Sequence, residues 1–306
     1  SLLVSIVLCN NPNFFCFKNL DLFTQNSCIW LFSKKSYLIV KGSVHFYGTK
    51  ESPIILEGIE DSWKGIYVLS KEEMRSNFNH VQIDGTTGVS DGILNLSGGV
   101  NVYRGDVYID NMLIKNTSAE DALNIVSSKV DIFELHIKSS NSDGFDCDYC
   151  SGLIKNSSFT KIGGDALDFS GSTLDLKDLF IEGVKDKGIS VGESSLVSIG
   201  DSYINDVGVG IASKDGSKTY VANIKIGRYG SHGVMTYIKK PFYNSQTYLE
   251  LSDSAVHGNS PYLRQKNTTM VVDGENVGDV DLNVKEMYKS GVMKKWMKTI
   301  DMKLSF

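Results

Sequence analysis

The sequence predicts an all-β fold, a right-handed parallel β-helix solenoid with coils of about 22 residues and caps at its ends. Three observations lead to this prediction: a segment that recurs at a fixed spacing, apolar residues that alternate inside it, and a β-rich composition. Only 4 Pro accompany 29 Gly, 14 Tyr and 14 Phe, so Gly, Asn and Asp would make the turns. Long helices are not expected.

The recurring segment returns every 22 residues along the middle of the chain. A period of this length indicates stacked coils, each of which buries its apolar side chains only against its neighbours. A leucine-rich repeat would need a Leu/Asn consensus and a β-propeller a period of about 40 residues or more, and neither is present. The copies are DALNIV, DGFDCD, DALDFS, KGISVG and VGIASK, which begin at Asp121, Asp143, Asp165, Lys187 and Val209.

Apolar residues alternate within each copy, so one face of each strand points into a core. Two further strands per coil repeat this pattern, which predicts a triangular coil. The first strand supplies the columns Leu123, Phe145, Leu167, Ile189, Ile211 and Ile125, Cys147, Phe169, Val191, Ser213. The second supplies Val130, Leu174, Leu196 and Ile132, Ile154, Leu176, and the third supplies Ile137, Phe159, Ile181, Tyr203.

The period is clear only in the centre, and the chain divides into three predicted segments. Residues 1–36 are expected to form an apolar N-terminal cap or lead-in, and residues 37–275 the β-helix. Residues 276–306 are rich in Lys and Met at helical spacing, and we expect a C-terminal cap or tail that is partly helical, because solenoid ends need a cover.

Charge and hydrophobicity exclude two classes of partner. The net charge is −5, with 31 basic and 36 acidic residues, which is no footprint for binding nucleic acid. No run reaches the ~18 apolar residues needed to span a membrane. The oligomeric state is not predicted. Cys147 and Cys150 have the spacing of half a zinc site, but no second pair lies nearby in the sequence.

Acidic residues form columns beside the apolar ones. Asp146 and Asp168 are 22 residues apart, as are Asp143 and Asp165, and Asp148 takes the next outward position. Carboxylates stacked on neighbouring strands repel, so they need a cation, a lysine or a proton as compensation. A purely structural reading applies to the turn residues, since Asp at a turn accepts backbone N–H bonds.

Two kinds of chemistry fit these columns. A Ca²⁺ site could use oxygen ligands from adjacent coils, with Asp143, Asp146, Asp148, Asp165 and Asp168 as the candidates. Acid–base cleavage of a glycosidic bond could use two carboxylates, with nearby lysines as bases or anion ligands. The candidate catalytic residues are Asp146, Asp168, Lys187 and Lys214, and the candidate substrate-binding residues are Arg104, Glu193, Asp215, Lys239 and Lys240.

Several stretches between residues 37 and 240 resemble the pectate-lyase-like family of right-handed parallel β-helix proteins. They include GGVNVYRGDV, SDGFDCDYCSG, GGDALDFSGS and DKGISVGE. The chain also resembles the bacterial subgroup found fused or adjacent to spore-coat-type CotH kinase domains. The resemblance implies a secreted or surface-associated protein with a carbohydrate-related role, but brings no established catalytic set.

Two hypotheses follow. The first is an extracellular or cell-surface β-helix that binds or processes a polysaccharide, acidic if the lysines contact it. As an enzyme it would be a glycoside hydrolase or a lyase, in which calcium neutralises a uronate and Lys214 or Lys187 removes the neighbouring proton. The second is a non-catalytic structural or adhesin-type surface protein, or the partner of a kinase domain, in which the columns are structural.

Overall fold

The computed structural model describes residues 15–18, 22–25, 28–71, 74–90, 95–243 and 246–289. Nearly every regular element in these ranges is a β-strand, and almost all strand pairs are parallel. The described chain is a parallel β-solenoid, as predicted. It divides into two compact units, residues 1–146 with 150–158, and residues 147–149 with 159–306, and each unit is described by itself.

The first unit stacks its strands in parallel columns. β4, β7, β11 and β13 form one column and β5, β8, β12, β14 and β16 another. The strands are β1 (Phe15–Lys18), β2 (Leu22–Gln25), β3 (Cys28–Phe32), β4 (Tyr37–Lys41), β5 (Val44–Tyr47), β6 (Ile54–Gly58), β7 (Gly65–Leu69), β8 (Arg75–Asp84), β9 (Val89–Ser90), β10 (Asn95–Leu96), β11 (Gly98–Tyr103), β12 (Asp106–Thr117), β13 (Asp121–Val126), β14 (Lys129–Ser140) and β16 (Ser151–Lys155). β15 (Asp143–Asp148) begins in this unit and ends in the second, and the first residue of β17 (Ser158–Ile162) also belongs to this unit.

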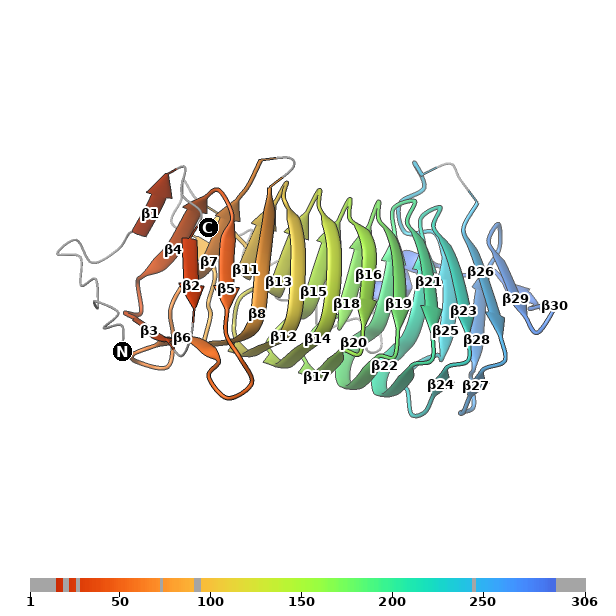
Figure 1. The fold of residues 1–306 in the computed structure, drawn as a ribbon. Helices are drawn as coiled ribbons and strands as arrows, with labels where there is room; N and C mark the ends of the chain where they lie inside the picture. The colour runs from red at the N-terminus through yellow and green to blue at the C-terminus, as the bar shows by residue number, and fades with distance from the viewer. Residues whose placement is uncertain are drawn as a thin grey trace. The chain divides into compact units, whose positions relative to one another are not determined.

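The second unit is also built from coils of parallel strands (Figure 1). Its first-strand column contains β18, β20, β22, β25 and β28. The elements are β17 (Ser158–Ile162), β18 (Leu167–Ser170), β19 (Thr173–Lys177), β20 (Phe180–Gly192), β21 (Leu196–Gly200), β22 (Tyr203–Lys214), β23 (Lys218–Ala222), β24 (Lys225–Ile226), β25 (Val234–Tyr237), β26 (Tyr248–Ser252), β27 (Ala255–Val256), β28 (Tyr262–Gln265), β29 (Thr269–Val272), β30 (Glu275–Asn276), β31 (Asp279–Val280) and α1 (Val284–Lys289).

The predicted apolar columns of the first strand lie in the core. Leu167 pairs in register with Ile189, and Ile189 with Ile211, and all three are fully buried. Leu123 and Phe145 are buried in the first unit. This alternation of buried and outward residues fixes which side chains reach the outer face.

The sequence repeat assigns two residues, Leu196 and Tyr203, to buried columns in which the structure does not place them. Leu174 pairs with Val197, not with Leu196, and Ile181 pairs with Ile204, not with Tyr203. The cause is a local spacing of 23 residues, one more than the repeat, and a shift of one residue turns a side chain to the other face of a strand. Leu196 is therefore 41% exposed.

The predicted end segments are only partly described. The lead-in at residues 1–36 contains β1, β2 and β3, which pair in parallel with β4, β5 and β6. The C-terminal segment contains the short helix α1, while residues 1–14 and 290–306 lie outside the described residues. Within the described residues no helix is long and apolar enough to cross a membrane.

Candidate functional site

The candidate site lies on the outer face of the second unit, on the strands that carry the predicted acidic and lysine residues. Asp168 on β18, Ser190 on β20, Ala212 on β22 and Met235 on β25 pair in register. They alternate with the buried column that begins at Leu167, so they point away from the core.

Lys187 is a buried charge at the centre of an ion-pair network. Its Nζ donates to Asp165 Oδ1 and Oδ2 at 3.2 and 3.3 Å and to Asp186 Oδ2 at 2.9 Å. Burial disfavours the charged amine, but Asp165 and Asp186 outweigh it and raise the pKa of Lys187 well above its ordinary value. Burial raises the pKa of the Asp165 carboxyl, although Lys187 opposes the shift. Lys187 is therefore a protonated bridge between two carboxyl groups.

Lys214 and Asp168 form the second charge pair. Lys214 Nζ lies 3.6 Å from Asp168 Oδ1, and the Asp168 side chain is 28% exposed, whereas that of Lys214 is 5% exposed. Burial would raise the pKa of Asp168, but Lys214 and Lys187 overcome it and lower that pKa. The pKa of Lys214 is raised because Asp168 outweighs the effect of burial. Asp168 is thus an ionised carboxylate with access to solvent.

Asp148, at the end of β15 and half-buried, shows the opposite shift. Burial is the main cause that raises its pKa, and the charge of Asp168 adds to it. The pKa values of Asp148 and Asp168 are therefore shifted in opposite directions. Such a divergence is typical of a general acid and a general base in one site.

A third charge pair lies beside the first two. Lys240 Nζ forms an ion pair with Glu193 Oε1, and Ser170 Oγ donates to Glu193 Oε2 at 2.7 Å. Asp215 Oδ1 accepts the backbone N–H groups of Lys239 and Lys240, both at 2.6 Å. The fully buried Asp215 thereby fixes the segment that presents these two lysines.

Two tyrosines, Tyr237 and Tyr288, lie beside the lysines of the site. The hydroxyl groups of Tyr237 and Tyr288 are 2.7 Å apart, and Lys239 Nζ lies 4.6 Å from the centre of the Tyr288 ring. Lys187 Nζ lies 6.0 Å from the same ring. Side chains of residues 282–288 pack on the outward-facing Ala212, Met235 and Tyr237.

Most of these residues were predicted from the sequence as site residues, but Asp186, Tyr237 and Tyr288 were not. Asp186 could have been found, because it directly precedes Lys187 and could share its partner. Tyr237 lies one coil after Lys214 in the same outward register, which was also a usable signal. Tyr288 lies beyond the clear repeats, and nothing in the repeat pattern predicts its contact with Lys187.

The remaining predicted residues belong to the first unit. Asp146 Oδ2 accepts a hydrogen bond from Asn124 Nδ2 at 3.4 Å, the backbone N–H of Asp143 donates to Glu120 at 2.9 Å, and Arg104 has a positive φ of 69°. Their assignment to one site with Asp168 stays a prediction.

The second-unit residues do not fit the predicted calcium site. Lys187 and Lys214 lie against the carboxylates of Asp165 and Asp168, where a cation would have to be. No group of three or more His, Cys, Asp or Glu in the described part of the chain is arranged for a metal ion. Cys147 and Cys150 are disulfide-bonded, so neither is a thiolate ligand for zinc.

The comparisons with known proteins show a similarity of fold only. No family model and no curated protein sequence matches the chain. It is similar to the crystal structure of an alginate lyase from Paenibacillus sp. str. FPU-7, at 12% identity over 84% of this chain and 89% of that one, with a TM-score of 0.46. The periplasmic alginate epimerase AlgG matches at 10% identity over 80% of this chain and 72% of that one, with a TM-score of 0.46.

Tailspike protein 2 of the Escherichia coli O157:H7 bacteriophage CAB120 matches at 10% identity over 82% of this chain and 42% of its own, with a TM-score of 0.37. Similarity this distant carries no argument about function, so the proposals below rest on the residues of the site. The narrower resemblance to CotH-associated proteins stays a prediction.

Proposed function

We propose that the protein is a carbohydrate-active β-helix that binds a polysaccharide beside Asp148 on β15 and Asp168 on β18 and hydrolyses its glycosidic bonds. The observation that carries the proposal is the pair Asp148 and Asp168, whose pKa values are shifted in opposite directions. Hydrolysis of a glycosidic bond needs one protonated and one ionised carboxyl group in the same site.

The pair has a role for each member. Asp168 accepts a proton from a water molecule while the water oxygen attacks the anomeric carbon. Asp148 gives its proton to the oxygen of the leaving sugar as the glycosidic bond breaks. One water is consumed, two shorter chains are released, and proton exchange with solvent returns both carboxyl groups to their starting states.

The lysines fit binding better than proton abstraction. Lys187 and Lys214 have raised pKa values, so neither is a neutral amine near pH 7, as the base of a lyase would be. Lys214 instead keeps Asp168 ionised. Lys239 is exposed and the Lys240 side chain is 41% exposed, which suits contact with the carboxylates of an acidic polysaccharide. No step of this proposal requires calcium.

An extracellular or surface location belongs to the same proposal, because the disulfide-bonded Cys147 and Cys150 suit an oxidising compartment.

Substitution of the two carboxyl groups tests the proposal. The full chain is incubated with neutral and acidic polysaccharides, and new reducing ends are counted. We expect Asp168→Asn and Asp148→Asn each to lower the rate at least about 100-fold, since general acid–base catalysis contributes about 10²–10⁴. The matched control is Asp175→Asn, at an exposed position of β19, and it should keep the wild-type rate. No cleavage of any polysaccharide by the wild type would contradict the proposal.

A structural surface protein is the second candidate, and one observation favours it. Asp165, Asp186 and Lys187 satisfy one another while only 6%, 6% and 3% exposed, as expected of a ladder that holds coils together. If all charged residues of this face, Asp148 and Asp168 included, have only such a structural role, substitutions at Asp148 and Asp168 should leave every sugar interaction unchanged.

A further inference from the structure

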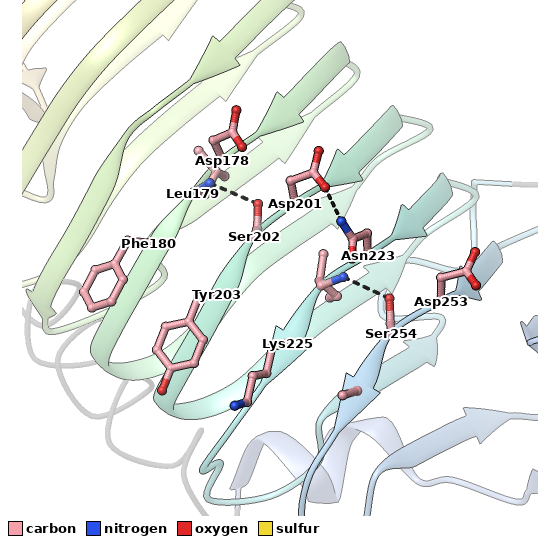
Figure 2. A pocket seen from close by; sticks show the side chains of 12 residues that line it. Asp178, Leu179, Phe180, Asp201, Ser202, Tyr203, Asn223, Lys225, Asp253 and Ser254 are labelled. Carbon is pink, nitrogen blue, oxygen red and sulfur yellow. Dashed lines mark hydrogen bonds between the residues drawn. The ribbon is translucent and has the colours of Figure 1, made fainter.

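A separate groove runs along the bend between the second and third strands of the coils in the second unit (Figure 2). It lies after β19, β21, β23 and β26, whereas the proposed catalytic face lies on the first strands. One wall is a column of polar side chains at the bend, and the other is a column that begins with two aromatic rings. The two columns have different physical origins.

The polar wall follows from the backbone of the bend. Asp178, Asp201, Asn223 and Asp253 have positive φ angles of 55°, 47°, 55° and 48°, a conformation that Asn and Asp tolerate better than other side chains. Asn223 Nδ2 donates to Asp201 Oδ1, and Lys177 pairs with Asp201 at 3.0 Å. The bend needs these residue types, so this wall alone does not indicate a ligand.

The aromatic wall has no such structural requirement. Phe180 and Tyr203 pair in register on β20 and β22, with ring centres 5.6 Å apart and ring planes at 24°. Phe180 is 41% exposed, and Lys225 continues the column on β24. Figure 2 shows both rings and the Lys225 side chain on the same side of neighbouring strands, opposite the row of carboxylates.

We propose that this groove binds a linear neutral glycan that runs along the stack of coils. The rings of Phe180 and Tyr203 stack on each other, and the exposed surface of this ring pair offers an apolar contact for the C–H faces of sugar rings. The oxygens of Asp178, Asp201 and Asn223 lie across the groove, where they can accept hydrogen bonds from sugar hydroxyls. The carboxylates of Asp178, Asp201 and Asp253 outnumber the lysines at this groove, Lys177 and Lys225, which disfavours an acidic glycan. The ligand class therefore differs from the acidic polysaccharide proposed to contact Lys239 and Lys240.

Binding of cellohexaose, a neutral linear oligosaccharide, to the full chain tests this inference by calorimetry. The measurement uses the Asp168→Asn background, so that cleavage at the other face neither consumes the probe nor decides the result. Phe180→Ala with Tyr203→Ala should weaken binding by at least about tenfold, the scale of a binding hot spot. Tyr203→Phe keeps the ring and should retain the affinity.

The matched control is the outward pair Tyr220 and Tyr248 on β23 and β26, whose ring centres are 5.8 Å apart but whose planes are tilted by 50°. Tyr220→Ala with Tyr248→Ala should leave binding unchanged. Thermal unfolding establishes that both double variants fold. The inference is overturned if the wild-type groove binds oligogalacturonate but not cellohexaose, if neither probe binds, or if the two double variants lose affinity equally.

Discussion

At the scale of single residues, the outer face of the second unit depends on lysines placed between carboxyl groups. Lys187 donates to Asp165 and Asp186 while 3% exposed, and Lys214 stabilises the charge of Asp168. A buried ion pair adds little stability compared with an apolar replacement of both partners, but removal of one partner leaves a buried charge uncompensated. This asymmetry makes Lys187 a sensitive position.

Lys187→Met should lower the free energy of unfolding by about 3–5 kcal/mol, because Asp165 and Asp186 lose their shared cation. The contribution of Lys187 should be fully present below the ordinary lysine pKa of about 10.4 and be lost as pH rises through its higher folded-state pKa. Urea unfolding at pH 7 measures the loss. Lys185→Met, two residues earlier and exposed, is the control, and equal stability of the two variants would refute the network.

At the scale of elements, register decides which side chains become core and which become site. A spacing of 22 residues places Leu167, Ile189 and Ile211 in one buried column, and the same count brings Asp168 and Ser190 together on the outside. Where the spacing is 23, the count misassigned Leu196 and Tyr203. The repeat alone therefore predicts strand faces in the regular coils, but it cannot predict where a single extra residue falls in a bend.

Leu167→Ala should lower the free energy of unfolding by about 2–5 kcal/mol, because a fully buried side chain is removed from a stack that can settle only in part. Leu196→Ala is the matched control, since this leucine is 41% exposed and its loss should change stability by no more than about 0.5 kcal/mol. Chemical denaturation of both variants makes the comparison. A larger loss at Leu196 than at Leu167 would contradict the register.

At the scale of the whole molecule, the repeated coils form the β-solenoid, and the site combines residues of the repeat with residues outside it. The acidic residues recur with the coils and were found in the sequence, whereas the segment of residues 282–288 packs on the outer face without a repeat signal. The sequence predicted compensation of Asp165 and Asp168 by a cation, a lysine or a proton. It could not decide among these, because that choice depends on side-chain positions, which place Lys187 and Lys214 beside them.

In the proposed reaction Asp148 donates a proton and Asp168 accepts one during cleavage of a polysaccharide. The most direct test is the rate of reducing-end release as a function of pH for the wild type and Asp148→Asn. The wild-type rate should rise at acid pH as Asp168, whose pKa is lowered, ionises, and fall at higher pH as Asp148, whose pKa is raised, loses its proton. Asp148→Asn should lose the high-pH fall together with most of the rate. A variant that keeps the wild-type rate and the same two-sided profile would contradict the account.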